Sequence, residues 1–288
     1  MEERTYPGKI ILFGEYTIIV GGKVLALPLN NITARWQKRN NTKNGDSDLL
    51  HYAEYLSKES NEYLHFSAFL EEIQDGLTLV SDIPRGYGAG SSGALVAAVF
   101  DRFQKEEKQY TTEELKNIFS CLESYFHGTS SGIDPLVSFM NRPVHIDKNK
   151  NIELVDKDLS VQLQSFYLVD SGRSKVTEKY VQIFRDNLQC NNYVKKLEEL
   201  EILNTAIIDG LIGKISRKDL SAYMKNISLL QWDLFQPMIP PNIAKVWKKG
   251  LDTGRYCIKL CGSGGGGYFL GFSDEKNRIE KGWIPLIG

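Results

Sequence analysis

The segment 84–94, Pro-Arg-Gly-Tyr-Gly-Ala-Gly-Ser-Ser-Gly-Ala, is the part of the sequence best suited to binding an anion. It lies between an apolar run that predicts a strand and one that predicts a helix, so backbone N–H groups and the helix dipole converge on one place. Gly86, Gly88 and Gly90 allow positive φ angles and close approach of a ligand. A tight packing turn needs only one glycine, so three alternating glycines followed by two serines favour phosphate binding.

A second glycine run, residues 262–267, lies between two apolar segments that predict strands. A connection of this length needs fewer glycines if it only turns, so the composition favours a surface that another group approaches closely. Both 88–93 and 262–267 match the spacing GxGxxG, but neither has the strand–helix–strand context of a dinucleotide site. A Walker A loop is absent from the sequence, so any use of ATP does not depend on a P-loop.

Lys9 and Glu15 stand inside an otherwise apolar run, residues 7–20. Burial of an unpaired charge is costly, so each residue needs either a partner or a place on the solvent face of a strand. Alternation along a strand allows the solvent-facing arrangement. The periodicity does not decide between the two.

Two carboxylates, Glu123 and Asp134, flank a loop of small residues. Glu123 lies beside the apolar stripe of a predicted helix, and Asp134 precedes a proline. Taken singly, the first fits a solvated helix residue and the second a turn former. Their combination beside a glycine-rich loop favours one shared pocket.

The elements that must position these residues are read from hydrophobic periodicity, turn residues and a capping box at Thr111 and Glu114. The expected strands are residues 6–20, 24–36, 77–83, 161–170, 256–260 and 268–272. The expected helices are residues 63–73, 92–103, 111–126, 174–188, 193–212 and 218–235, and a last helix that ends at Gly254. This order predicts an α+β chain of two lobes, divided near residue 160.

The composition of the 288 residues is that of an ordinary globular protein, with 42% hydrophobic and 25% charged residues. The 35 basic and 36 acidic side chains give a net charge of −1, which excludes non-specific attraction to nucleic acid or to an anionic membrane. The four cysteines form no CxxC pair, which favours reduced thiols in a cytoplasmic protein. The apolar run near the start contains Gly14 and Glu15, so we expect neither a signal peptide nor a membrane span.

Three segments resemble, in order, the motifs of the GHMP small-molecule kinases: residues 7–15, 83–94 and 259–267. Within this family, residues 123–134, with eleven positions from glutamate to aspartate, are similar to the mevalonate kinase branch, as are residues 170–177. The likeness spans most of the chain. It implies a two-lobed GHMP kinase fold, with an N-terminal mixed-sheet ATP-binding domain over residues 1–160. A ferredoxin-like α+β domain is expected over residues 161–288.

The resemblance also implies a reaction: transfer of a phosphoryl group from ATP, with Mg²⁺, to the primary hydroxyl of mevalonate in isoprenoid precursor synthesis. Asp134 is the expected base and Lys9 its partner, while Ser92 and Glu123 are the expected Mg²⁺ ligands. The residues expected to bind the nucleotide are Gly86, Gly88, Ala89, Gly90, Ser91, Ser92 and Gly93. The residues expected near the substrate are Glu15, Tyr16, Thr177, Gly264 and Gly265. The partner is a small molecule, and a homodimer is possible in this family.

Several positions depart from the family pattern. Tyr16 stands where the family usually has histidine beside the substrate, so the acceptor is the least determined feature. Gly93 replaces an alanine, Thr129-Ser130 replace an Asn-Pro pair, and a glycine pair expected after the aspartate is missing.

Alternative functions remain open beside mevalonate phosphorylation. A phosphomevalonate kinase is one, because Arg85, Arg173 and Lys175 could bind a substrate phosphate. A sugar kinase fits less well, since the first motif differs from that of galactokinase. A catalytically silent ATP-binding regulatory module is the alternative from another class. The intact set of lysine, serine and two carboxylates argues for catalysis.

Overall fold

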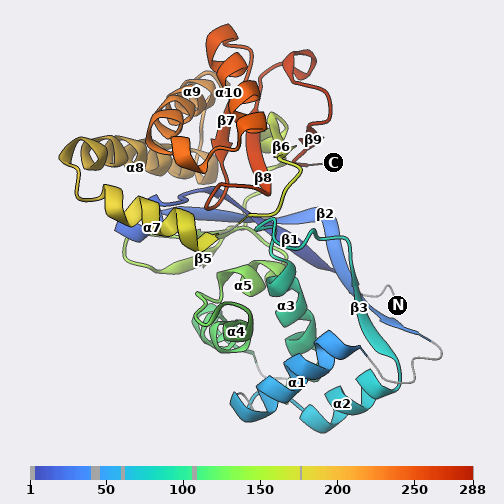
Figure 1. The fold of residues 1–288 in the computed structure, drawn as a ribbon. Helices are drawn as coiled ribbons and strands as arrows, with labels where there is room; N and C mark the ends of the chain where they lie inside the picture. Colours follow the sequence, from blue (N-terminus) through green and yellow to red (C-terminus); the bar gives the residue numbers. More distant parts are fainter. Residues whose placement is uncertain (1–3, 40–45, 60–61, 106–108, 176, 288) are drawn as a thin grey trace. The chain divides into compact units, whose positions relative to one another are not determined.

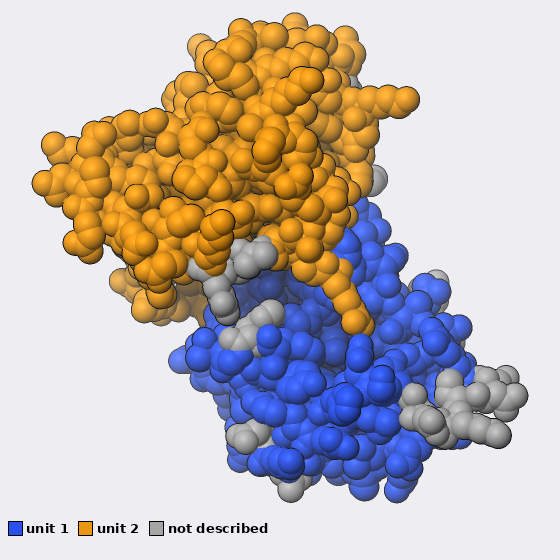
Figure 2. Space-filling model, in the orientation of Figure 1, with its two compact units in different colours: residues 1–9, 28–84, 90–142 blue, residues 10–27, 85–89, 143–288 orange. Residues whose placement is uncertain are grey.

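The computed structural model describes residues 4–39, 46–59, 62–105, 109–175 and 177–287 (Figure 1). The chain forms two compact units that are both discontinuous in sequence (Figure 2). Unit 1 consists of residues 1–9, 28–84 and 90–142, and unit 2 of residues 10–27, 85–89 and 143–288. The first two strands therefore contribute residues to both units. The domain boundary at residue 160 stays a prediction.

The first sheet has five strands in the order β1-β2-β4-β5, with β3 also paired to β2. Its strands are β1 (Tyr6–Phe13), β2 (Val24–Lys38), β3 (Leu77–Ser81), β4 (Val144–Ile146) and β5 (Ile152–Leu154). The long strand β2 pairs antiparallel with β4 near its start and with β3 near its end. Nearly every residue of β1 is buried, so this strand is covered on both faces, which is why its residues other than Lys9 do not alternate between apolar and polar.

The predicted extension of the first strand to Val20 is wrong. The strand ends at Phe13, and residues Thr17–Val20 form a short 3₁₀-helix, η1. Gly14 has a φ of 103° and Tyr16 a φ of 63°, so the backbone leaves the extended region at these two residues. The turn between the first two strands is therefore longer than the Gly21-Gly22 pair suggested.

Unit 1 contains a group of helices around α3 (Ser91–Phe103), most of whose residues are buried and which packs mainly against two others. These are α4 (Thr112–His127) and α5 (Ile133–Met140), and all three lie together in Figure 1. The predicted capping box is confirmed, because Thr111 accepts from the backbone of Glu114 and its own N–H donates to the Glu114 carboxylate. Unit 1 also contains α1 (Ser47–Glu59) and α2 (Phe66–Gln74).

Unit 2 contains an antiparallel sheet of four strands in the order β7-β8-β6-β9. They are β6 (Phe166–Asp170), β7 (Cys257–Leu260), β8 (Tyr268–Phe272) and β9 (Ile284–Pro285). Numbered along the chain, these strands lie in the order 2-3-1-4, which is that of a ferredoxin-like sheet. The short 3₁₀-helix η3 (Lys276–Arg278) stands where that fold has its second helix. The predicted α+β class is confirmed.

The helices of unit 2 follow the predicted order. They are α6 (Ser160–Leu163), α7 (Thr177–Asn187), α8 (Asn191–Ile212), α9 (Arg217–Leu234), the 3₁₀-helix η2 (Gln236–Met238) and α10 (Pro241–Thr253). The predicted break at Pro240-Pro241 is confirmed, since Pro240 caps α10 and Pro241 begins it. The strand expected from residue 161 starts later, at Phe166, because residues 160–163 form α6. In the described part of the chain, no helix combines the length and the apolar character that crossing a membrane requires.

Candidate active site

The start of α3 in unit 1 has the geometry expected of an anion site. Gly90 caps the helix with a φ of 78°, and Gly86 and Gly88 also have positive φ, as the sequence predicted. A Cβ at Gly90 would lie 2.8 Å from Lys9 Cγ and 3.1 Å from the Lys9 backbone nitrogen, so no other residue fits there. The N–H groups of a first helical turn have no acceptor within the helix and point outward along its axis. Residues Ser91, Ser92 and Gly93 make up this first turn.

Lys9 and Asp134 form the predicted ion pair. Lys9 Nζ lies 2.9 Å from Asp134 Oδ2, and the lysine is buried whereas about a third of the aspartate side chain is exposed. Strand β1 supplies the lysine, and the first turn of α5 supplies the aspartate. A Cβ at Gly93 would lie 2.7 Å from the carbonyl carbon of Asp134, so this glycine lets α5 approach α3. The solvent-facing alternative for Lys9 is thus ruled out.

Glu123 is the second carboxylate of the same unit and is only 3% exposed. Its Oε1 accepts a hydrogen bond of 3.1 Å from Ser92 Oγ, and its Oε2 accepts one from Ser130 Oγ. Burial raises the pKa of Glu123 to about 7, and the negative charge of Asp134 adds to this effect. The two serine hydrogen bonds and Lys9 act in the opposite direction.

Ser130 was not predicted as a site residue, although its position was noted as a departure from the family pattern. It stands in the loop before α5, and its hydroxyl also accepts from the backbone N–H of Gly132. The available signal was its place between the two carboxylates in sequence. The family pattern offered no such hydroxyl at this position.

The donor set around Glu123 fits Mg²⁺. Carboxylate and hydroxyl oxygens are the hard ligands that this ion prefers, and the raised pKa of Glu123 indicates a site that favours added positive charge. Among the described residues, no group of three or more His, Cys, Asp or Glu side chains is arranged to hold a metal ion. Mg²⁺ is commonly held by one or two carboxylates together with substrate phosphates, which matches this sparse set.

Glu15, in unit 2, forms a buried ion pair with a partner that the sequence analysis did not identify. Its Oε1 lies 2.6 Å from Lys259 Nζ, and both side chains are almost completely inaccessible to solvent. Lys259 also donates to the carbonyl oxygens of Leu12 and Leu260. Burial raises the pKa of Glu15, while the lysine opposes that shift. The substrate role of Glu15 stays a prediction.

Gln231 of α9 completes this network. Its Nε2 donates to Glu15 Oε1, and its Oε1 accepts from the backbone N–H of Leu260 at 2.8 Å. Lys259 could have been found by the reasoning that singled out Lys9, because it too is a charged residue inside an apolar strand.

Tyr16 and the second glycine run lie against each other in unit 2. The Tyr16 hydroxyl donates to the carbonyl oxygen of Ser263 at 2.7 Å, and its ring stacks near Phe184 and Phe235. The expected close approach to the glycine run is confirmed, but the approaching groups belong to this chain. A Cβ at Gly264 would lie 2.6 Å from the Met238 carbonyl oxygen.

Gly265 is approached still more closely. A Cβ there would lie 1.9 Å from a ring carbon of Tyr180, a residue of α7. Thr177 begins the same helix, and its side chain lies outside the described part of the structure. Substrate contacts of these residues stay predictions.

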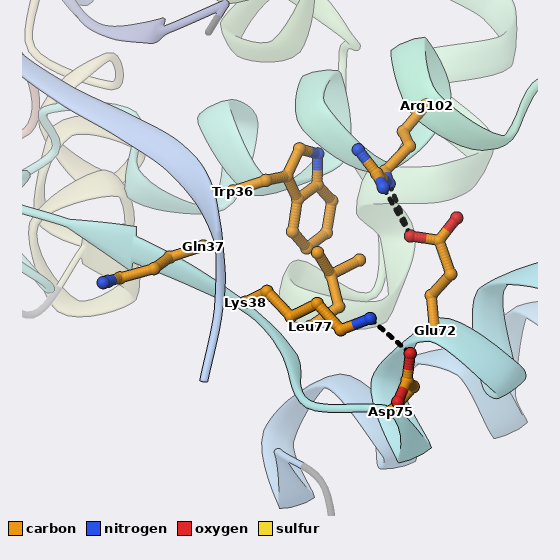
Figure 3. Close-up of a pocket in the computed structure, with 7 residues that line it drawn as sticks. All are labelled: Trp36, Gln37, Lys38, Glu72, Asp75, Leu77 and Arg102. Atoms are coloured by element: carbon orange, nitrogen blue, oxygen red, sulfur yellow. Dashed lines mark hydrogen bonds and ion pairs between the residues drawn. The ribbon is translucent and has the colours of Figure 1, made fainter. Parts of the chain in front are cut away.

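A hollow of about 350 Å³ in unit 1 contains none of the predicted site residues (Figure 3). Its charged side chains form two ion pairs, Lys38 with Asp75 and Arg102 with Glu72. Trp36, Gln37 and Leu77 complete its walls. The four charged side chains that line the hollow neutralise each other in pairs, so they give a charged ligand little reason to bind there.

Comparison with known proteins agrees with the motifs. The family described as GHMP kinases N terminal domain matches residues 49–142. The chain is 25% identical to the mevalonate kinase of Thermococcus gammatolerans, over 98% of this chain and 92% of that protein. It is 24% identical to the mevalonate kinase of Archaeoglobus fulgidus, over 94% of this chain and 93% of that protein.

Solved structures share the fold. The Methanococcus jannaschii mevalonate kinase superimposes with a TM-score of 0.66 at 16% identity, over 96% of this chain and 91% of that one. The L. major mevalonate kinase in complex with R-mevalonate gives a TM-score of 0.60 at 16% identity, over 96% and 89%. A Streptococcus pneumoniae phosphomevalonate kinase gives 0.62 at 16% identity, over 96% and 92%. The predicted resemblance and the predicted fold are confirmed.

Proposed function

We propose that this chain, which resembles the GHMP kinases in sequence and fold, transfers the γ-phosphoryl group of ATP to the primary hydroxyl of mevalonate. The observation that carries the proposal is the pair of Lys9 and Asp134, 2.9 Å apart, beside the glycine-capped start of α3. The names of the curated relatives support the choice of acceptor. The cytoplasmic location and the homodimer stay predictions.

Asp134 is the group that receives the proton of the acceptor hydroxyl. Phosphoryl transfer depends mainly on positioning and on stabilisation of negative charge, so the base has to be held in place beside the reacting oxygen. Lys9 performs this task, because its buried ammonium bonds one carboxylate oxygen. The same ammonium stabilises negative charge that develops on the phosphoryl group.

The start of α3 binds the phosphates of the nucleotide through backbone N–H groups and the helix dipole. Ser92 and Glu123 are the residues that would hold Mg²⁺, which when bound neutralises phosphate oxygens and withdraws charge from the bond that breaks. A Glu123 pKa of about 7 means that its negative charge is poorly stabilised by the protein alone. A cation beside it relieves this cost.

The test is ADP release with mevalonate, phosphomevalonate, galactose or no acceptor, with the product identified by phosphorus NMR. We expect turnover with mevalonate and a product phosphorylated on the primary hydroxyl. Asp134→Asn should lower turnover by about 10²–10⁴-fold, the usual contribution of a positioned base. Asp252→Asn, which changes an exposed aspartate of α10, is the matched control. Turnover with phosphomevalonate alone, or an unaffected Asp134→Asn enzyme, would refute the proposal.

A further inference from the structure

Three loops of unit 2 contact one another through their backbones: residues 85–89, 173–175 and 262–267. The Lys175 N–H donates to the carbonyl oxygen of Gly86 at 2.8 Å, and the Gly267 N–H donates to that of Arg173 at 2.7 Å. A Cβ at Gly267 would lie 2.2 Å from the Tyr87 carbonyl oxygen. The first loop is therefore held by the two others.

The ammonium group of Lys175 lies where these loops meet. A Cβ at Gly88 would be 2.1 Å from Lys175 Nζ, and a Cβ at Gly262 would be 3.0 Å from it. The ammonium thus occupies the space that side chains at both glycines would fill. Side chains at either position would displace this positive charge from the glycine loop.

The backbone next to this ammonium alternates in the sign of its φ angles. Gly86 and Gly88 have φ angles of 75° and 68°, and the intervening Tyr87 and the following Ala89 have negative φ. Such alternation is a feature of loops whose successive N–H groups turn toward one side and bind an anion. A lysine ammonium is a point charge that commonly complements phosphate at such loops.

We propose that Lys175 binds the nucleotide through the phosphates beyond the α-phosphate. This inference rests on the proposed function, which makes a nucleotide the substrate of this loop. An anionic group of the acceptor, a carboxylate or a phosphate, is the competing ligand of the same chemistry. Gly88 belongs to the loop that leads directly into the cap of α3, and this favours the nucleotide.

The experiment measures binding of ATP, ADP and AMP by calorimetry in the absence of acceptor. Lys175→Met should weaken ATP and ADP binding by about tenfold or more, as expected for loss of a charge-assisted hydrogen bond, and leave AMP binding unchanged. Lys175→Arg should restore most of the affinity for ATP and ADP. Lys248→Met, which removes an exposed lysine of α10, is the matched control and should bind all three nucleotides normally.

Three results would overturn the inference. An equal loss for all three nucleotides would assign Lys175 to loop packing, and no loss would remove it from the site. A change confined to the acceptor KM in turnover assays would assign it to the acceptor. Because the binding assay contains no acceptor, a chain that binds ATP but does not phosphorylate mevalonate refutes only the proposed function. Absence of nucleotide binding in the unaltered protein overturns both.

Discussion

Replacement of Lys259 by methionine should strongly destabilise the folded state of unit 2. The substitution keeps the volume of the side chain but leaves the Glu15 carboxylate without its counter-charge. Among the described residues Glu15 Oε2 has no hydrogen-bond partner, so the Gln231 amide and a backbone hydrogen bond of Glu15 itself are left to stabilise the charge. Removal of one member of a buried ion pair typically costs about 3–5 kcal/mol. Total stabilities are about 5–15 kcal/mol, so the loss is a large fraction.

The assay is a double-mutant cycle of urea unfolding with Lys259→Met, Glu15→Gln and the combined variant. Replacement of both charges removes the cost of an uncompensated ion, so the double variant should recover at least half of the loss seen in the worse single variant. Lys23→Met serves as a control, because its partner Asp209 is half-exposed and an exposed pair contributes little.

The same variant has a predicted pH dependence. Burial raises the pKa of Glu15 in the folded protein, and loss of Lys259 removes a group that opposes the rise. A carboxyl group with a higher pKa in the folded than in the unfolded state binds more protons when folded, so stability falls as pH rises above the unfolded value. Lys259→Met should therefore lose stability relative to the unaltered protein from pH 5 to pH 8. If the stability losses of the two single variants simply added in the double variant, and showed no dependence on pH, this account of the Glu15–Lys259 pair would be refuted.

Further predictions concern the carboxylates of unit 1. Because the Glu123 pKa is raised to about 7, its ionised form is lost as pH falls through 7. Mg²⁺ titrations of ATP turnover should therefore show weaker apparent metal affinity at pH 6 than at pH 8. Equal affinities would contradict the assignment of Glu123 as a Mg²⁺ ligand. Ser130→Ala removes a hydrogen bond that favours the ionised form, so the midpoint of that Mg²⁺ dependence should move to higher pH, and an unmoved midpoint would separate Ser130 from the site. Gly93→Ala places a Cβ 2.7 Å from the Asp134 backbone and should lower kcat at least tenfold with mevalonate KM little changed; steady-state kinetics showing full kcat would mean that α5 moves without consequence.

The conformation of the glycine loop 86–90 was predictable from the sequence because it rests on local rules. Positive φ angles at Gly86, Gly88 and Gly90 follow from residue type, and a helix start follows from a cap and an apolar run. The resemblance to a family then supplied the partner of Lys9.

The Glu15–Lys259 pair was not predictable in the same way. A charge inside an apolar strand indicates that a partner is required, but the identity of that partner depends on which distant strand the fold brings near. The backbone leaves the extended region at Gly14, directly after the first strand, and the positive φ of Tyr16 two residues later is not what its residue type predicts. The two features that the sequence did not predict lie at the neighbouring residues Glu15 and Tyr16.

The two units interleave along the chain, and this orders events during synthesis on a ribosome. Residues 10–27 emerge early but belong to the unit that is completed last. The charge of Glu15 has no compensating lysine until Lys259 has been translated, 244 positions later. A nascent chain halted before residue 259 therefore carries a carboxylate that cannot be buried at low cost, and release of the C-terminal segment becomes the step that commits unit 2 to its native core.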